Sequence, residues 1–179
     1  MSLIIQLDDI PEGAGLGLDF VEEPEYFEMD ESECSLNSGV HIKGVLTKLG
    51  QEIFLAGKIK TGMNLSCSRC LKTVQFPVDS DISVCFIPQK GSLNETEADM
   101  ELSNSDLEVE YYSDNKINLT PPVYDQIILS LPIVTLCQID CKGICSHCGK
   151  NLNAETCDCK EEGDIDPRLA ILKNLKDNL

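Results

Sequence analysis

Eight of the ten cysteines in this 179-residue chain fall into two tight groups, and this clustering restricts the possible folds more than any other feature. The first group is the Cys-x-x-Cys pair Cys67 and Cys70, and the second contains the six cysteines from Cys137 to Cys159. The N-terminal residues lack the basic region and long apolar stretch of a signal peptide, so we expect a cytoplasmic, reducing location. In that compartment, clustered cysteines indicate metal ligation or catalysis rather than disulfides.

Cysteines at these spacings are typical of structural zinc sites, in which four ligands surround the ion as a tetrahedron. One set lies close together in the sequence and can close a site locally: Cys145, Cys148, Cys157 and Cys159. Gly149, directly after a Cys-x-x-Cys pair, can take the positive φ of such a turn. The other set joins two distant parts of the chain: Cys67, Cys70, Cys137 and Cys141. We therefore predict two structural zinc ions, while the sequence alone leaves the pairing of the ligands open.

Clustered cysteines also occur in sites other than structural zinc sites. Thiolates also bind iron–sulfur clusters, and a Cys-x-x-Cys pair can be redox-active, usually within a thioredoxin-like βαβ unit that is not visible here. The spacing of Cys141, Cys145 and Cys148 also matches radical S-adenosylmethionine enzymes, but only 31 residues follow Cys148, too few for a barrel. Structural zinc is therefore the favoured interpretation.

Four other histidine and cysteine side chains are expected to have structural roles. His147 lies in the turn of the second cysteine group and is expected to be exposed rather than ligating. His41 is expected on the solvent face of a strand. Cys85 is expected to be a buried or half-buried thiol, and Cys34 an unreactive thiol in an acidic loop.

An alternation of apolar and polar residues predicts a β-rich domain over residues 1–136. The alternation indicates a hairpin over residues 40–65 with its turn at Gly50, followed by a pair of strands within residues 74–86. Because Pro77 cannot donate a ladder hydrogen bond, its part of the strand is expected at a sheet edge or a bulge.

Two acidic segments interrupt this pattern and are expected to form loops. Residues 8–39 contain several Gly and Pro residues and leave room for one short strand near residues 16–21. Residues 89–107 are polar, acidic and aperiodic, which is typical of a mobile surface loop. An edge strand is expected at residues 3–7.

Short helices complete the predicted fold. One helix is expected to begin with Thr120 as its N-cap, before two prolines, and to end near Leu131. A Cys-rich, zinc-ribbon-like module follows over residues 137–164, and a C-terminal helix over residues 165–179. The predicted class is therefore α+β, mainly antiparallel β structure arranged as a barrel or sandwich, with the metal module after it.

The charge balance narrows the kinds of partner. The chain has 31 acidic and 14 basic side chains and a formal net charge of −17, which disfavours a generic polyanion binder and favours basic partners. No apolar run is long enough to span a membrane, and no phosphate loop, catalytic constellation or small-molecule site is evident. We therefore expect a non-catalytic binding protein.

Two stretches of the sequence contain many residues at distinctive spacings. The first is Leu65-Ser66-Cys67-Ser68-Arg69-Cys70-Leu71 followed by Phe76-Pro77-Val78. The second consists of Leu131-Pro132, Cys137, Cys141-Lys142-Gly143-Ile144-Cys145, Cys148-Gly149-Lys150-Asn151-Leu152-Asn153, Cys157-Asp158-Cys159 and Asp166-Pro167-Arg168-Leu169-Ala170. Together they resemble the two signatures of the YceD family, also called DUF177. The resemblance is strong over residues 65–78 and 131–175 and weak over residues 1–64. Some family members lack the distal cysteines, whereas this chain keeps all eight.

The resemblance implies a role in the accumulation of 23S ribosomal RNA, and hence in assembly of the 50S subunit. It also suggests a large-subunit ribosomal protein as a partner, because a gene for such a protein commonly neighbours the family's gene. It implies no enzyme activity.

Two mechanisms fit this role. In the first, the acidic protein binds a basic ribosomal protein or the pre-50S particle. In the second, the zinc module binds ribosomal RNA directly through a small basic patch: Arg69, Lys72, Lys142, Lys150 and Lys160. A thiol redox enzyme or a nuclease is the less favoured alternative.

Overall fold

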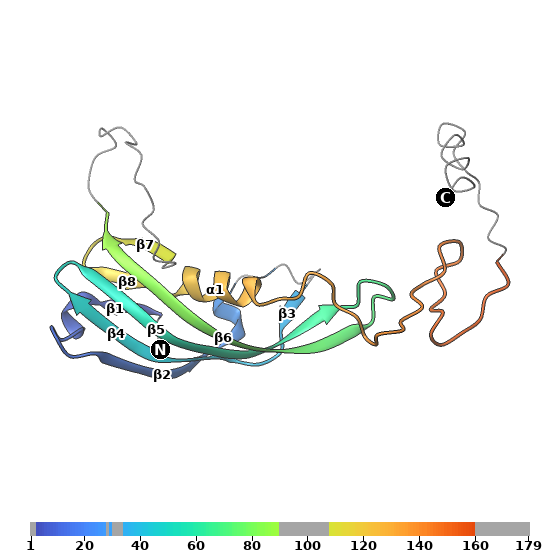
Figure 1. Cartoon of the computed structure of the whole chain (residues 1–179), viewed down its shortest axis with the longest axis horizontal. Helices are drawn as coiled ribbons and strands as arrows, with labels where there is room; N and C mark the ends of the chain where they lie inside the picture. The colour runs from blue at the N-terminus through green and yellow to red at the C-terminus, as the bar shows by residue number, and fades with distance from the viewer. Residues whose placement is uncertain (1–2, 28, 30–33, 90–107, 160–179) are drawn as a thin grey trace, which may run out of the picture.

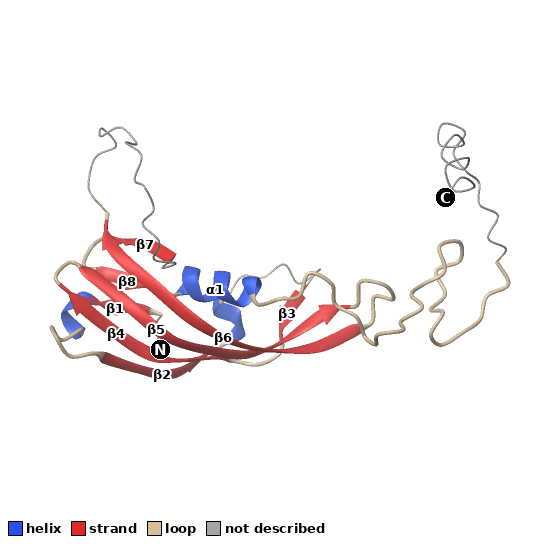
Figure 2. Cartoon of the chain, in the orientation of Figure 1, coloured by secondary structure: helices blue, strands red, loops and turns tan. Residues whose placement is uncertain are grey.

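The structure, a computed structural model, describes residues 3–27, 29, 34–89 and 108–159. Within them a six-stranded sheet forms the body of the molecule, with a two-stranded sheet and one α-helix beside it (Figure 1, Figure 2). The elements in chain order are β1 (Ile4–Gln6), η1 (Leu7–Asp9), β2 (Leu16–Glu22), η2 (Pro24–Tyr26), β3 (Cys34–Leu36), β4 (Val40–Leu49), β5 (Glu52–Ser66), β6 (Thr73–Pro88), β7 (Glu108–Tyr112), β8 (Lys116–Asn118) and α1 (Thr120–Leu129).

The strands of the large sheet follow the order β2-β4-β5-β6-β7, and β3 also pairs with β5. The pairs are antiparallel except for β6 and β7, which run parallel. β5 and β6 are 15 and 16 residues long and form one hairpin. The turn of this hairpin extends past the other strands and lies beside the chain that follows α1 (Figure 1).

The core lies between one face of the large sheet and the elements packed on it, α1 and the small sheet of β1 and β8. Alternate residues of β4, β5 and β6 point into this core, which produces their period of two. Val123 and Ile127 of α1 and Ile117 of β8 are fully buried there. Gln126 of α1 also donates to Ser80 Oγ of β6 at 2.7 Å. Each large apolar side chain buried in this way contributes about 1.5–3 kcal/mol.

The other face of the sheet carries cross-strand ion pairs between lysines of β4 and β5 and aspartates of the flanking strands. They are Lys43 with Asp19 at 3.1 Å, Lys58 with Asp81 at 2.7 Å and Lys60 with Asp79 at 2.8 Å. His41 lies on this face as expected, and its Nε2 is 2.7 Å from Asp19. The lysines of this face are therefore largely neutralised by their own neighbours.

The hairpin predicted over residues 40–65 is confirmed as β4 and β5, and Gly50 in its turn has a φ of +64°. The strand expected near residues 16–21 is β2, and the edge strand expected at residues 3–7 is the shorter β1. β3 is a three-residue strand within the segment expected to be mostly loop, and no alternation of apolar and polar residues predicts it. Cys34 lies in β3, half-buried against the core, instead of in a loop.

The pair of strands predicted within residues 74–86 is wrong, because β6 runs through this region unbroken. Asp79-Ser80-Asp81 has the composition of a turn, but both carboxylates pair with lysines of β5 and hold the segment extended. Pro77 is accommodated because β5 is the only described strand that pairs with β6 at that point, while β7 pairs from Val84 onward. The burial expected for Cys85 is confirmed.

The predicted class of mainly antiparallel β structure with a short helix is confirmed, but a barrel is wrong. The large sheet is open, and its hydrogen-bonded path ends at β2 and at β7. The sequence pattern identifies strands and their buried faces, but closure depends on whether the two edge strands meet, which no local pattern encodes.

The helix predicted to start at Thr120 is present as α1, but its N-cap position is Leu119 rather than Thr120. The oxygen that accepts the first amide belongs to Asn118, whose Oδ1 binds the Thr120 amide at 3.0 Å. α1 ends at Leu129, two residues before the predicted end. No helix in the described part of the chain is long and apolar enough to cross a membrane. The helix predicted over residues 165–179 and nearly all of the loop predicted over residues 89–107 lie outside the described residues.

The close approach of β4 and β5 at Gly44 and Gly57 yields a stability prediction. These glycines face each other, and a Cβ on Gly57 would meet the Lys43 carbonyl oxygen and lie 2.7 Å from the Gly44 Cα. We expect Gly57→Ala to lower the free energy of unfolding by about 1–3 kcal/mol, because the backbone of β4 would have to shift. The measurement is the midpoint of urea unfolding.

Gly17→Ala in β2 is the matched control, because a Cβ there meets no atom within 4 Å. We expect this substitution to leave stability almost unchanged. Equal unfolding midpoints for the two variants would contradict the predicted close contact between β4 and β5.

Candidate metal centres

The structure brings the eight clustered cysteines together in two groups of four, which match the sets favoured by the sequence spacing. Centre 1 consists of Cys67, Cys70, Cys137 and Cys141, and centre 2 consists of Cys145, Cys148, Cys157 and Cys159. Within each group the four sulfur atoms lie within 4.8 Å of one another. The cysteines outside these groups, Cys34 and Cys85, lie in strands of the sheet.

Centre 1 begins in the tight turn between β5 and β6. The Cys67 amide donates to the Lys72 carbonyl at 2.9 Å, and the Leu71 amide donates to the Cys67 carbonyl at 2.9 Å. Leu71 has a φ of +60°, a conformation that is usually left to glycine. This turn places both sulfur atoms of the Cys-x-x-Cys pair on the same side of the hairpin.

The chain after α1 supplies the other half of centre 1. The Ser68 amide donates to the Thr135 carbonyl at 2.8 Å, and the Thr135 amide donates to Ser68 Oγ at 3.2 Å. The Cys137 amide also donates to Cys67 Sγ at 3.4 Å. These contacts hold residues 135–141 against the turn of the hairpin. They join distant parts of the chain, since Cys137 and Cys67 are 70 positions apart in the sequence.

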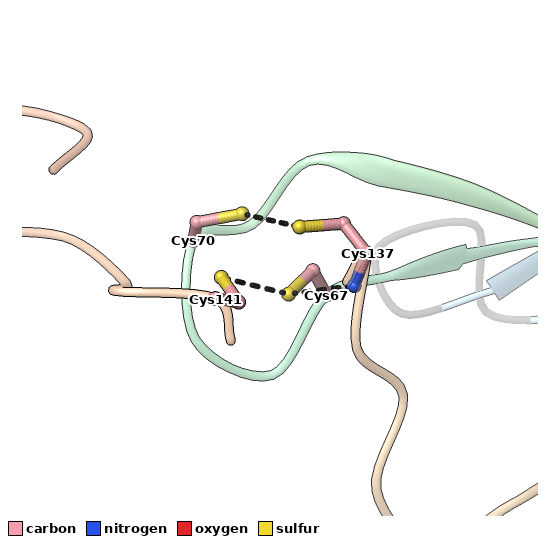
Figure 3. Close-up of side chains that lie close together, drawn as sticks. All are labelled: Cys67, Cys70, Cys137 and Cys141. Atoms are coloured by element: carbon pink, nitrogen blue, oxygen red, sulfur yellow. Dashed lines mark hydrogen bonds between the residues drawn. The ribbon is translucent and has the colours of Figure 1, made fainter. Parts of the chain in front are cut away.

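The sulfur geometry of centre 1 fits a tetrahedral metal ion. Cys67 Sγ lies 3.8 Å from Cys141 Sγ, and Cys70 Sγ lies 3.5 Å from Cys137 Sγ (Figure 3). Zinc–sulfur bonds of about 2.3 Å in a tetrahedron place neighbouring sulfur atoms about 3.8 Å apart. Cys67, Cys70 and Cys141 are buried, so the ion would be largely shielded from water.

Backbone amides prepare one sulfur atom of each centre for metal binding. The amides of Arg69 and Cys70 donate to the Cys67 sulfur and lower the pKa of this thiol to about 6. In centre 2 the amides of Cys148 and His147 lower the pKa of Cys145 to about 6 in the same way. Each centre therefore contains a thiolate near neutral pH.

A second sulfur atom in each centre is held as a thiol until an ion is bound. The sulfur of Cys70 raises the pKa of Cys137 to about 12, and the sulfur of Cys148 raises the pKa of Cys159 to about 12. Like charges so close together cannot all be ionised without a cation. The four sulfur atoms therefore form a site that a divalent cation completes.

Centre 2 repeats the turn of centre 1. The Cys145 amide donates to the Lys150 carbonyl at 2.8 Å, and the Gly149 amide donates to the Cys145 carbonyl at 2.9 Å. Gly149 has a φ of +71° and occupies the position of Leu71 in the first turn. Centre 2 is more open than centre 1, because Cys148 and Cys159 are exposed.

The five predicted basic contact residues have different surroundings. Arg69 donates from Nη1 to the Cys141 carbonyl at 2.8 Å, so its guanidinium helps to assemble centre 1. Lys150 lies 3.8 Å from Glu155. Lys72 and Lys142 are exposed, and Lys160 lies outside the described residues.

Asn153 belongs to the surroundings of centre 1 although the sequence predicts no role for it, whereas His147 is an exposed turn residue as predicted. Asn153 Nδ2 donates to Cys141 Sγ at 3.4 Å, although this asparagine lies within the loop of centre 2. The available signal was its place in the segment Asn151-Leu152-Asn153, which belongs to one of the family signatures.

The donor set limits the chemistry of both centres. Catalytic zinc sites usually have three protein ligands, several of them His or carboxylate, and keep one position for water. Four thiolates per ion leave no such position. The arrangement is therefore suited to holding the chain together rather than to activating water.

Comparison with known proteins adds independent information. Residues 55–176 match the family model described as large ribosomal RNA subunit accumulation protein YceD. An uncharacterised protein of Mycobacterium tuberculosis is 28% identical over 124 residues, which cover 69% of this chain and 56% of that protein. The uncharacterised protein YlbN of Bacillus subtilis is 28% identical over 175 residues, covering 96% of this chain and 94% of YlbN.

A chloroplastic protein of Arabidopsis thaliana, named large ribosomal RNA subunit accumulation protein YCED homolog 1, is 34% identical over 64 residues. That match covers 36% of this chain and 20% of the plant protein. The chain thus spans about half the length of the mycobacterial relatives that it matches. No solved structure matches. Because the family match includes the hairpin of centre 1 and all eight clustered cysteines, this chain belongs to the YceD family.

Proposed function

We propose that this protein is a non-catalytic ribosome-biogenesis factor that supports accumulation of 23S ribosomal RNA and assembly of the 50S subunit. In this proposal it binds a basic large-subunit ribosomal protein or the pre-50S particle in the cytoplasm, and two structural zinc ions hold its cysteine-rich segment in place. Membership of the YceD family supports the ribosomal role.

The charge distribution supports a basic partner rather than a nucleic acid. The net charge is −17, and Lys43, Lys58 and Lys60, on the face of the large sheet opposite the core, each lie within 3.1 Å of an aspartate. Lysines neutralised in this way contribute little to phosphate binding, which depends on releasing counterions from the nucleic acid. An acidic protein with paired lysines is instead complementary to a cationic ribosomal protein.

The all-thiolate donor sets support the non-catalytic part of the proposal. Both centres have the ligand number of closed structural sites, and two sulfur pairs of centre 1 lie 3.8 and 3.5 Å apart, close to the tetrahedral spacing. Zinc at centre 1 would fasten the segment after α1 to the hairpin of β5 and β6. The partner would then meet a rigid surface instead of a loose tail.

A second candidate function is direct binding of ribosomal RNA. Lys72 and Lys142 are exposed and belong to the two segments that meet at centre 1, so they place two accessible cations close to that centre. Arg69 and Lys150 are less available, because their side chains already have partners within the chain.

Affinity capture of the full chain from cells, with protein and RNA identified together at low and high salt, tests the proposal. We expect a basic large-subunit protein at low salt and its loss at high salt, because exposed charge pairs are screened. RNA captured without any ribosomal protein would overturn the proposed partner.

Charge reversal separates the two candidate mechanisms. Lys142→Glu with Lys150→Glu is expected to leave capture of the ribosomal protein intact, since it adds negative charge to an already acidic protein. Lys48→Glu with Lys116→Glu is the matched control, with the same change of charge in β4 and β8, outside both centres. Loss of RNA in the first variant alone, with no ribosomal protein in either capture, would favour direct RNA binding.

A further inference from the structure

We propose that Asn153 couples the two metal centres, so that ion binding at centre 2 strengthens ion binding at centre 1. This inference rests on the two metal centres of the proposed function and goes beyond them. It assigns a positioning role to a residue that is not itself a ligand. The juxtaposition behind it is that Asn153 lies within the loop of centre 2 while its side chain contacts a ligand of centre 1.

The Asn153 side chain makes three contacts with the chain of centre 1. Nδ2 donates to Cys141 Sγ at 3.4 Å, and Oδ1 accepts the Lys142 amide at 2.8 Å. Oδ1 also accepts from Gln138 Nε2 at 3.3 Å. Asn153 therefore fixes both the sulfur atom and the backbone direction of a centre 1 ligand.

The position of Asn153 depends on the loop that centre 2 closes. Asn153 lies between Cys148 and Cys157, and Asn151 Oδ1 accepts both its amide, at 2.9 Å, and its Nδ2, at 2.9 Å. The Leu152 amide donates to the Gly143 carbonyl at 2.9 Å. These bonds are short-range and largely exposed, so the loop needs the metal to stay in this conformation.

A hydrogen bond to a metal-bound thiolate stabilises its charge and orients its lone pairs. Removing a hydrogen-bond partner of a metal ligand typically lowers metal affinity about tenfold to hundredfold. If an ion at centre 2 orders Asn153, the affinity of centre 1 rises by that factor. Linkage requires the reverse effect as well, so an ion at centre 1 strengthens centre 2 equally.

A second connection is independent of the Asn153 side chain. The Ile144 amide donates to the Arg69 carbonyl at 3.1 Å, and Arg69 Nη1 donates to the Cys141 carbonyl at 2.8 Å. These bonds hold Cys141 near the hairpin even when Asn153 is changed. An Asn153 variant is therefore expected to weaken centre 1 without preventing its assembly.

The test is a double-mutant cycle on the full chain with Co²⁺ as the probe. One arm disables centre 2 with Cys145→Ser and Cys148→Ser, the other carries Asn153→Ala, and the fourth protein combines them. We expect either change alone to weaken Co²⁺ binding at centre 1 by about tenfold to hundredfold. We expect Asn153→Ala to add little when centre 2 is already disabled.

Asn153→Asp separates the amide donor from the rest of the side chain. It keeps an oxygen for the Lys142 amide and loses the N–H group at Cys141. Losing that donor raises the energy of the sulfur lone pairs, so the sulfur-to-cobalt charge-transfer band of centre 1 is expected to move to longer wavelength. Asn115→Asp adds the same charge in the turn between β7 and β8 and should leave the band unchanged.

The outcomes distinguish this inference from the metal centres on which it rests. Equal Co²⁺ affinity of centre 1 with and without centre 2, or an equal cost of Asn153→Ala in both backgrounds, would overturn the coupling while leaving two metal centres in place. A wild-type chain that binds no Co²⁺ would overturn the centres themselves.

Discussion

Removal of metal is expected to unfold the segment from residue 137 to residue 159 while the sheet stays folded. This segment has almost no apolar core, because the side chains buried within it are those of Cys141 and Cys145. Of its large apolar side chains, Ile139 is 95% exposed and Ile144 is 41% exposed, and Ile133, just before the segment, is 102% exposed. Structural zinc sites contribute about 10–16 kcal/mol in small metal-binding peptides, which is similar to the stability of a whole domain.

Amide hydrogen exchange before and after chelation measures this effect. We expect protection at the Cys145 and Gly149 amides to be lost, since their hydrogen bonds lie in the turn of centre 2. The amides of β4, β5 and β6 should remain protected, because their core residues do not depend on the cysteines. Survival of protection in the centre 2 turn after complete removal of metal would contradict the prediction.

Cys85→Ala provides the matched control for the role of the clustered cysteines. Cys85 is buried in β6 outside both centres, and burial raises the pKa of its thiol. We expect this variant to keep its metal content and to show only the modest loss of stability typical of removing a small buried group. Cys67→Ser, by contrast, should lose the ion of centre 1 and release residues 135–141 from the hairpin.

The grouping of the cysteines could be predicted because metal coordination imposes a strict requirement on number and type of ligand. Four thiolates satisfy one ion, and the short spacing from Cys145 to Cys159 allows them to meet without help from the rest of the fold. Cys67 and Cys70 then need two partners, and the remaining pair of clustered cysteines supplies them. The fold confirms this grouping by placing the chain after α1 beside the hairpin.

The strands could be predicted where one face is buried. The prediction failed in the middle of β6, where charged residues in place of apolar ones hold the strand extended. β4 and β5 show the alternation of half-buried strands, and Gly50 marks their turn. The sequence predicts a turn in the middle of β6 because aspartates such as Asp79 and Asp81 favour turns when they have no tertiary partners. Their ion pairs with β5 depend on the register of two strands, which is a tertiary property.

Asn153 and Leu71 show what no local pattern conveys. Asn153 contacts a sulfur atom 12 positions away, across the loop that joins the two centres, so the contact depends on tertiary structure. Leu71 takes a positive φ where the equivalent position of centre 2 is Gly149, so the residue type alone gave no reason to expect that turn geometry. The doubled Cys-x-x-Cys spacing indicates a repeated motif, and the hydrogen bonds show that both turns close in the same way.

Acid is expected to release metal from both centres, with a steeper dependence below about pH 6. Binding an ion displaces protons from every thiol that is still protonated, and each proton displaced changes the affinity tenfold per pH unit. Near pH 7, Cys137 with a pKa of about 12 still carries its proton, whereas Cys67 with a pKa of about 6 is largely ionised. Below about pH 6, Cys67 is protonated as well and must lose its proton to bind the ion, so at least one further proton is displaced.

The stability of the fold before metal binding changes in the same direction. The pKa of Cys67 is lowered from 9.0 to about 6, so its contribution to stability is present above its unfolded pKa and is lost as the pH falls through about 6. The pKa of Cys137 is raised instead, so its contribution changes only above its unfolded value of 9.0, outside the acidic range. Acid therefore weakens the centres in two ways, through the competition of protons for the ligands and through the loss of the Cys67 contribution to stability. The Cys137 contribution does not oppose either effect between pH 5 and pH 7.

Zn²⁺ affinity measured from pH 5 to pH 8 checks this expectation. As the pH is lowered, we expect the affinity of each centre to fall at least about tenfold per pH unit down to pH 6 and at least about hundredfold per pH unit below pH 6. Cys85→Ala should follow the wild-type curve, because this thiol binds no ion. Centre 2 should show the same change of slope, since Cys145 and Cys159 repeat the pKa values of Cys67 and Cys137, at about 6 and about 12. An affinity that stays constant between pH 5 and pH 7 would mean that the ion is not held by thiolates.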